Sequence, residues 1–259
     1  MIYIMNEEIM PTHIGFIVDG NRRWAREKGL PILEGHRKGF SQVEKIASYA
    51  IDRGCKYVSF YLFSTENWNR SEEEVSYLMD LLRHNIARLK KRFIKEEIRC
   101  VVFGREEPAP EDILDSLKDL EEATEDFKRG TVAVCFNYGG QWEIADAVRE
   151  IVANRMMAFS SAVKDQLEGR ASMEDVRNVM RQAVEISPET IAVNLYHPEV
   201  PPCDLIVRTS GEERISGFQL WRASYSEFLF LKKYFPDFTE KDFDAVVAEY
   251  NTRSRRFGK

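Results

Sequence analysis

The hydrophobic residues of the chain fall into short continuous runs separated by longer stretches with helical spacing. The short runs are too brief for helices and predict buried strands. Between them, apolar residues that recur every three or four positions predict helices. The expected strands are 14–18, 56–63, 98–104, 131–137, 203–208 and 227–231, and the expected helices are 36–53, 71–94, 110–129, 137–154 and a last one from 239.

Strands that alternate with helices along the chain are typical of βαβ units. The sequence therefore predicts an α/β fold with a six-stranded, mostly parallel sheet flanked by helices. Gly54 is expected to end the first long helix, and Ser71 with Glu74 is expected to form a capping box that opens the second.

The length of 259 residues suits one large domain, and no internal repeat or Pro/Gly-rich linker divides it. A single domain over 1–259 is expected. The stretch from about 155 to 196 has no strand pattern and predicts inserted helices, with breaks at Gly169 and Pro188.

Composition and charge argue against several classes of protein. The net charge of -6 disfavours nonspecific binding of nucleic acid, so any anion site must be local. The four cysteines are far apart without paired spacing, and three of them lie in apolar runs, which indicates buried thiols there and a reducing compartment. The apolar start, 1–5, is short and lacks a basic leader, and no run is long enough to cross a bilayer. We expect a cytoplasmic protein.

Polar residues come directly after four of the predicted strands. Asp19, Ser64, Asn137 and Arg208 each follow a strand. Since parallel strands end at one edge of a sheet, where open α/β proteins bind ligands, we expect these residues to form one site.

The first of these turns, 19–24, combines a carboxylate, a glycine, an amide and two guanidinium groups. Gly20 would let the backbone approach a ligand closely, and Asp19 could hold a divalent cation. Arg22 and Arg23 could bind phosphate oxygens. The simpler alternative is that Asp19 caps the next helix while solvent surrounds both arginines.

The groups expected to converge at this edge are cations and hydroxyls with two carboxylates. Several guanidinium groups with two oxygen ligands suit a diphosphate with magnesium better than a single phosphate. The apolar stripes of the helices over 36–53 and 71–94 either pack on the sheet or form the wall of a site for an apolar substrate. The converging groups are Arg22, Arg23, His36, Arg70, Arg208, Arg214, Ser64, Ser216, Asp19 and Glu227.

The motif Asp-Gly-Asn-x-Arg-Trp after a buried strand resembles the signature of the cis-prenyltransferases, the undecaprenyl diphosphate synthase family. The resemblance covers nearly the whole chain, with its motifs in order. The further matching segments are 35–36, 63–70, 137–140, 208–212, 214–216, Trp221, Glu227, 236–238 and 256–258.

The resemblance implies a Mg²⁺-dependent prenyl transferase. It would condense isopentenyl diphosphate with an allylic diphosphate such as farnesyl or geranyl diphosphate. The allylic C–O bond breaks, the isopentenyl double bond attacks, and loss of a proton leaves a Z double bond in a polyprenyl diphosphate. A product of short or medium length is one alternative. A carrier lipid of undecaprenyl length for cell-wall glycan assembly is the other. A peripheral membrane contact for product release stays open.

The resemblance also implies roles for individual residues. Asp19 and Glu227 would bind the metal, and Asp19, Asn21 and Ser64 would be catalytic. Helices would form a tunnel for the polyprenyl tail. The tunnel residues would be Leu62, Val43, Ile46, Leu78, Leu82 and Ile86.

The implied substrate contacts fall into groups. Asn21, Arg23 and His36 would bind the allylic diphosphate, and Arg208, Arg214 and Ser216 the isopentenyl diphosphate. Arg256 and Gly258 resemble a tail that reaches into the site of a partner subunit, which implies a homodimer. The remaining contacts would be Gly20, Arg22, Trp24, Phe63, Ser64, Glu66, Trp68 and Arg70.

The sequence departs from the family pattern in three places. Ile32 stands where most members have an arginine, and the stretch between Asn137 and Arg208 is longer than usual. Leu62 stands where long-chain members have a small residue, and we hypothesise that it narrows the tunnel and shortens the product.

Two rival functions remain. A phosphohydrolase of the haloacid dehalogenase type would need a second aspartate where Asn21 stands. A non-catalytic subunit would lose the aspartate and arginines of the first turn, but Asp19, Asn21 and Arg23 are all present.

Overall fold

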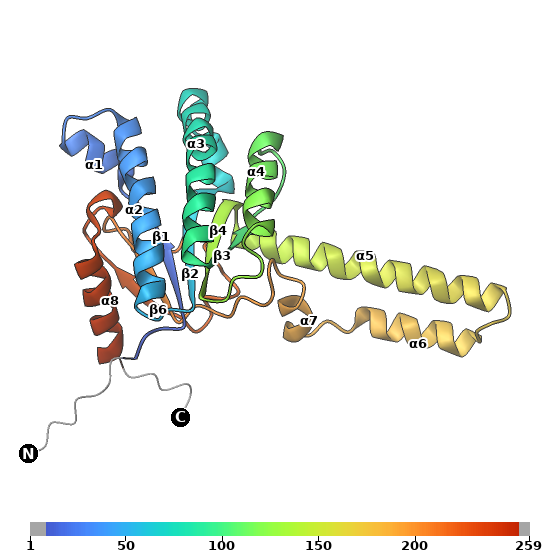
Figure 1. Cartoon of the computed structure of the whole chain (residues 1–259). Coiled ribbons are helices and arrows are strands. Elements are labelled where there is room, and N and C mark those ends of the chain that lie inside the picture. Colours follow the sequence, from blue (N-terminus) through green and yellow to red (C-terminus); the bar gives the residue numbers. More distant parts are fainter. Residues whose placement is uncertain (1–8, 254–259) are drawn as a thin grey trace, which may run out of the picture. The chain divides into compact units, whose positions relative to one another are not determined.

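The computed structural model describes residues 9–253. Its six strands form one sheet in the order β3-β4-β2-β1-β5-β6, and every neighbouring pair is parallel (Figure 1). The prediction of six strands is confirmed, and the sheet is entirely rather than mostly parallel. The strands are β1 (His13–Ile17), β2 (Tyr57–Ser64), β3 (Ile98–Phe103), β4 (Gly130–Tyr138), β5 (Leu205–Arg208) and β6 (Glu227–Phe230).

Among the described residues, 9–139 and 201–253 together form one compact unit, in which helices separate the strands. The helix predicted over 36–53 begins earlier, at Ile32, because Pro31 supplies the extended residue at its start. It ends before Gly54, whose φ of 101° is the left-handed conformation expected after a helix. The helices of this unit are α1 (Asn21–Glu27), α2 (Ile32–Asp52), α3 (Glu72–Glu96), α4 (Glu111–Glu122) and α8 (Glu240–Thr252), with 3-10 turns η1 (Thr65–Asn69) and η2 (Phe235–Asp237).

Residues 140–200 form a second compact unit made of helices. α5 (Gly140–Leu167) and α6 (Met173–Val184) lie antiparallel, and α7 (Pro188–Ala192) follows (Figure 1). The predicted breaks are confirmed, since Gly169 lies in the turn between α5 and α6 and Pro188 begins α7. The predicted end of α5 near Asn154 is wrong, because its helical pattern continues to Leu167.

The core of the first unit lies between the sheet and helices α2, α3, α4 and α8 (Figure 1). Phe16 of β1 is fully buried, stacks on Phe60 at 5.4 Å between ring centroids and meets Phe238 edge-on at 5.7 Å. Every residue of β4 is buried, as expected for a central parallel strand covered on both faces. All four cysteines are buried and free, which confirms the prediction of buried thiols.

A polar cluster is enclosed where β1 and β2 begin. His13 is fully buried, its Nδ1 donates to Pro201 O at 2.7 Å, and its Nε2 then accepts from Ser59 Oγ at 2.6 Å. Burial lowers the pKa of His13 to about 4. The ring is therefore neutral near pH 7.

None of the helices in the described part of the chain is apolar over a length that would span a bilayer.

Candidate active site

Three of the predicted residues meet where β1, β2 and β5 end. Ile17 of β1 pairs in register with Arg208 of β5, and β2 ends at Ser64 on the other side of β1. Asp19 follows β1 by two residues, so the parallel register brings it next to Arg208. This edge is the one at which open α/β sheets bind ligands.

Asp19 accepts hydrogen bonds from both sides. Its Oδ2 accepts from Arg208 Nη2 at 2.9 Å, and its Oδ1 accepts from the backbone N–H of Gly20 at 2.6 Å and lies 3.4 Å from Arg23 Nη2. Gly20 has a φ of 99°, and a Cβ there would collide with Tyr234. Glycine is thus required for the chain to turn from β1 into α1.

Glu212 connects two of the candidate phosphate-binding arginines. Its Oε1 is 2.9 Å from Arg23 Nη1, and its Oε2 is 2.6 Å from Arg214 Nη1. The two guanidinium groups, Arg214 first, lower the pKa of Glu212. Arg208 in turn donates to Ser216 Oγ at 2.8 Å. Sequence reasoning noted Glu212 only as part of a motif and missed its role as the carboxylate between the two arginines.

A second ionic cluster surrounds Glu74 of α3. Its Oε1 is 3.0 Å from Arg70 Nη1 and 3.5 Å from His36 Nε2, and its Oε2 is 3.4 Å from Arg22 Nη1. Burial, followed by the charge of Arg70, lowers the pKa of His36 to about 4, although Glu74 acts in the opposite direction. His36 is therefore neutral near pH 7 and can take part in hydrogen bonds without a charge.

Asn21, the first residue of α1, is pressed against α2. A Cβ at Gly35 would collide with the backbone carbonyl of Asn21, and one at Gly39 would lie 2.3 Å from its Oδ1. Two glycines one turn apart thus allow α1 and α2 to approach closely. Asn21 Oδ1 is buried and has no hydrogen-bond partner among the described residues. Since Asn21 also lines the cavity between α1, α2 and α3, its side-chain amide is available to contact a ligand there.

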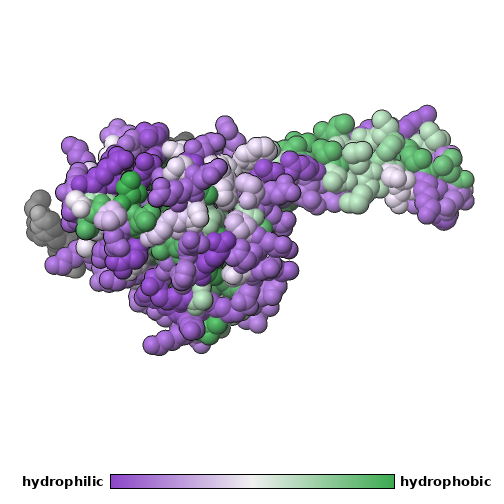
Figure 2. Space-filling model, turned by 90° about the horizontal axis from the view of Figure 1, so that it is seen from above, coloured by the Kyte–Doolittle hydropathy of each residue, from purple (hydrophilic) through white to green (hydrophobic). Residues whose placement is uncertain are grey.

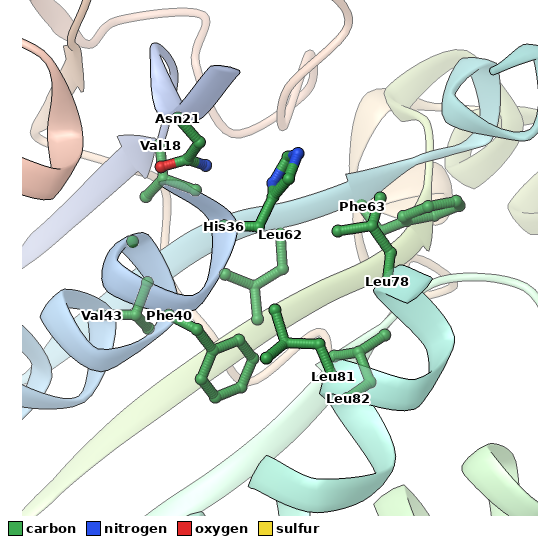
Figure 3. Close-up of a pocket in the computed structure, with 11 residues that line it drawn as sticks. Val18, Asn21, His36, Phe40, Val43, Leu62, Phe63, Leu78, Leu81 and Leu82 are labelled. Atoms are coloured by element: carbon green, nitrogen blue, oxygen red, sulfur yellow. The ribbon is translucent and has the colours of Figure 1, made fainter. Parts of the chain in front are cut away.

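A cavity that is open to solvent lies between α2, α3 and the ends of β1 and β2, with about 430 Å³ of empty space including the solvent at its mouth. Figure 3 shows Asn21 and His36 at one end and Phe40, Leu81 and Leu82 at the other. The cavity therefore has a polar end beside the ionic clusters and an apolar remainder.

Four of the six residues expected to form a tunnel line this cavity, namely Val43, Leu62, Leu78 and Leu82. Ile46 and Ile86 do not line this cavity, and their assignment to a tunnel stays a prediction. They lie one turn further along α2 and α3, and both are buried in the packed core.

Glu227, which the resemblance names as a second metal ligand, does not lie next to Asp19 within this chain. Glu227 begins β6 and pairs with Leu205, three residues before Arg208, so it lies about 10 Å towards the opposite edge of the sheet. Its Oε2 is 2.9 Å from Arg253 Nη1. Because all strands of the sheet are parallel, Glu227 at the start of β6 lies at the opposite edge from Asp19, which follows the end of β1.

Contacts of Trp68 with Asn137 and Phe63 hold the turn after β2 in place. Trp68 Nε1 donates to Asn137 Oδ1 at 2.8 Å, and its ring meets Phe63 at 4.8 Å between centroids. Asn137 is fully buried at a φ of 47° and donates to the carbonyls of Arg105 and Glu107. Asn137 therefore holds the turn in place and does not point into the cavity.

The remaining predicted contacts differ in exposure. Glu66 is exposed and Phe63 is buried on the cavity wall. Trp24 is buried, Lys28 Nζ lies 5.0 Å from its ring centroid, and its Nε1 has no hydrogen-bond partner among the described residues. Arg256 and Gly258 lie outside the described residues.

Comparison with known proteins shows which proteins this chain is similar to. Residues 17–258 match the family model described as "Putative undecaprenyl diphosphate synthase". The isoprenyl transferase of Thermotoga maritima is 41% identical over 249 residues, covering 96% of this chain and 97% of that protein. A trans,polycis-polyprenyl diphosphate synthase specific for (2Z,6E)-farnesyl diphosphate, from Thermobifida fusca, is 37% identical and is covered over 82% of its length, with 97% of this chain aligned.

Among solved structures, lavandulyl diphosphate synthase from Lavandula x intermedia, in complex with dimethylallyl diphosphate, superposes with a TM-score of 0.82. The two are 30% identical, and the match covers 98% of this chain and all of that one. Family model, relatives and fold agree with the motifs read from the sequence. The chain belongs to the undecaprenyl diphosphate synthase family, the cis-prenyltransferases.

Proposed function

We propose that the chain condenses isopentenyl diphosphate with an allylic diphosphate such as farnesyl or geranyl diphosphate to give a Z-polyprenyl diphosphate. One observation carries the proposal: a cavity with an apolar wall has, at its polar end, Asn21 and His36 beside two clusters of arginines. Such a site fits a ligand with an anionic head and a hydrocarbon tail. The names of the relatives describe enzymes with substrates of this kind.

Magnesium fits the residues at the mouth. Mg²⁺ retains several waters and is commonly held by one or two carboxylates together with substrate phosphates. Asp19 supplies one carboxylate, with 29% of its side chain exposed, and the described residues contain no cluster of three acidic, histidine or cysteine ligands. A bound ion would neutralise charge on the departing diphosphate.

Different residues of the chain would bind the two diphosphates. Arg23 with Asn21 and His36 would bind the allylic diphosphate, and Arg208, Arg214 and Ser216 the other. Asp19 and Glu212 bridge these two groups of arginines, so the two diphosphates would lie next to one another. Guanidinium groups held in place before the reaction stabilise the negative charge that develops as the allylic C–O bond breaks.

The turn after β2 would orient the reactants. Ser64 and Arg70 flank this turn, and Trp68 is fixed by Asn137. Because these residues stand on a braced turn beside the cavity, they can keep the isopentenyl double bond close to the allylic carbon. Close, aligned reactants remove much of the entropic cost of a bimolecular step.

A product of short or medium length is part of the proposal, because the large side chain of Leu62 lies on the apolar wall of the cavity. Each further unit that finds apolar space gains up to about 4 kcal/mol, so extension continues until the space is filled. Leu62 on the cavity wall would limit it.

A homodimer is part of the proposal. In the second unit, Val152, Met156 and Phe159 of α5 are exposed and recur at intervals of four and three residues, the spacing of helices that pair. Met173, Met180 and Val184 of α6 are exposed as well. Figure 2 shows hydrophobic side chains, in green, gathered over these helices.

The charges of this unit point to a second copy as the occupant of its apolar face. Acidic residues outnumber basic ones over 140–200, which disfavours an anionic membrane at this surface. A self-complementary apolar face is typical of two-fold dimers. A looser membrane contact elsewhere, for product release in a cytoplasmic enzyme, would be tested by co-sedimentation with lipid vesicles.

The proposal is tested by incubation with labelled isopentenyl diphosphate, Mg²⁺ and primers of different length. The expected result is label in prenyl diphosphates only when primer and metal are both present. Hydrolysis of simple phosphate esters without any isoprenoid would instead support a phosphohydrolase.

A further inference from the structure

Glu74 does not complete the capping box that its sequence context predicts. Ser71 Oγ accepts from the backbone N–H of Glu74 at 3.3 Å, so one half of the box is formed. The Glu74 carboxylate, however, lies against Arg70, Arg22 and His36, and only 12% of the side chain is exposed. A local role at the helix start therefore does not account for its position.

The three groups around this carboxylate come from different parts of the fold. Arg22 is in α1, His36 is in α2, and Arg70 follows η1. Arg22 and Arg70 each lower the pKa of His36, which shows that they stand close enough to repel a further positive charge. Without an anion between them the two arginines would repel one another as well, and their side chains would lose a fixed orientation.

His36 links this cluster to the cavity. Its ring lines the polar end of the cavity, next to Asn21, while its Nε2 is 3.5 Å from Glu74 Oε1. Glu74 itself does not line the cavity. Any influence of Glu74 on a ligand there must act through the groups that it holds.

We propose that Glu74 is a positioning residue, an internal anion that holds Arg22, Arg70 and His36 in the orientation that receives a substrate diphosphate. The inference rests on the proposed function, since it assumes an anionic head at this end of the cavity. Glu74 has two opposite effects on that head. It repels the charge of the diphosphate, but it fixes the groups that must align it for reaction.

Because Glu74 repels the diphosphate but positions the groups that align it, its replacement should change pyrophosphate affinity and turnover in opposite directions. Replacing the carboxylate by an amide removes a negative charge near the bound anion, so inorganic pyrophosphate should bind more tightly, on the order of tenfold. Turnover should fall by roughly 10²-fold, because the arginines no longer hold the head in its reactive position. A residue that only stabilised the helix would not shift these two quantities in opposite directions.

The test compares Glu74→Gln with Glu73→Gln. Glu73 is an exposed residue in the same first turn of α3, so its replacement removes the same charge from the same helix start. Pyrophosphate affinity is measured by calorimetry, kcat and KM with an allylic primer, and folding by thermal unfolding. Glu73→Gln is expected to match the native protein in affinity and kcat.

A third variant, Glu74→Asp, keeps the charge but shortens its reach. It should leave pyrophosphate affinity near the native value and lower kcat, so the test remains decisive if the amide variant folds poorly. Glu74 variants that behave like Glu73→Gln, or that lose affinity and kcat in parallel, would overturn the inference. If the native protein transfers no prenyl group while Glu74→Gln still binds pyrophosphate more tightly, the proposed function fails and the anion site stands.

Discussion

Arg208 donates a hydrogen bond to Asp19, with 2.9 Å between Nη2 and Oδ2. The pair joins the residue proposed to bind the metal to a residue proposed to bind the isopentenyl diphosphate. Arg208 is 5% exposed, so it cannot simply turn into solvent when Asp19 takes up a cation. Metal binding at Asp19 would therefore free guanidinium N–H groups for a diphosphate, and the two binding events should favour one another.

Replacing Asp19 by Ala is expected to lower turnover by about 10³-fold or more, with little change in the thermal unfolding temperature. The Asp19 side chain is 29% exposed, and Arg208 keeps its hydrogen bonds to Arg214 O and Ser216 Oγ when the carboxylate is removed. Steady-state kinetics with Mg²⁺ in excess measure the effect. Asp19→Asn serves as a control of similar shape, and near-native activity in either variant would contradict the metal assignment.

Gly39→Ala is expected to reduce kcat/KM by roughly 10²-fold, because the added methyl group displaces the side chain of Asn21 from the polar end of the cavity. Gly29→Ala is the matched control. Gly29 also lies beside α1, with no atom within 4 Å of the added carbon, and at a φ of 64° its replacement costs stability only. Equal kinetics in the two variants would show that the position of Asn21 does not matter.

Leu62→Ala is expected to lengthen the product by one or more isoprene units, because it removes a side chain from the cavity wall. Leu231→Ala is the control, since Leu231 packs partly buried against the core without lining the cavity. Chromatographic sizing of the labelled products gives the answer. An unchanged product distribution in Leu62→Ala would refute a role for Leu62 in limiting length.

The protein should lose stability as the pH falls from about 6.5 to about 4. In this range the unfolded chain binds a proton at His13 and the folded chain does not, so each step to lower pH favours unfolding. The difference amounts to roughly 3 kcal/mol at the low end, and His36 adds to it in the same direction. Denaturant unfolding of the native protein and of His13→Asn at both ends of this range measures the loss, which should be smaller in the variant.

Met156→Glu is expected to convert the proposed dimer into monomers, because it places a charge in the exposed apolar face of α5. Asn154→Glu, two residues away and also exposed, should leave the dimer intact. Sedimentation velocity distinguishes the two outcomes. A native protein that is already monomeric at micromolar concentration would contradict the proposed homodimer.

The parts of the fold that depend on local patterns could be predicted from the sequence. All six strands were expected within a few residues, because short apolar runs in a parallel sheet stand out against helical spacing. The meeting of Asp19 with Arg208 could also be expected, since both follow strands. Glu227 begins its strand, so within this chain it lies away from Asp19. The motif shows that a residue belongs to the family pattern but not at which edge of the sheet it lies.

Other parts of the site depend on side-chain directions, which the sequence leaves open. The stripe of α2 includes both Val43 and Ile46, yet only Val43 lines the cavity, because one further turn carries Ile46 into the packed core. Glu74 was interpreted as a capping residue because its spacing from Ser71 fits a capping box. Its contacts with three cations from other elements appear only when the chain is folded.

The most direct test of the central claim, that this edge of the sheet joins two diphosphate-bearing isoprenoids, is the mass of the product. The protein is incubated with labelled isopentenyl diphosphate, Mg²⁺ and farnesyl or geranyl diphosphate, and the products are separated by size. We predict labelled diphosphates that exceed the primer by whole five-carbon units and stop at short or medium length. Unchanged primer and unconsumed isopentenyl diphosphate, from a folded protein with metal present, would contradict the account.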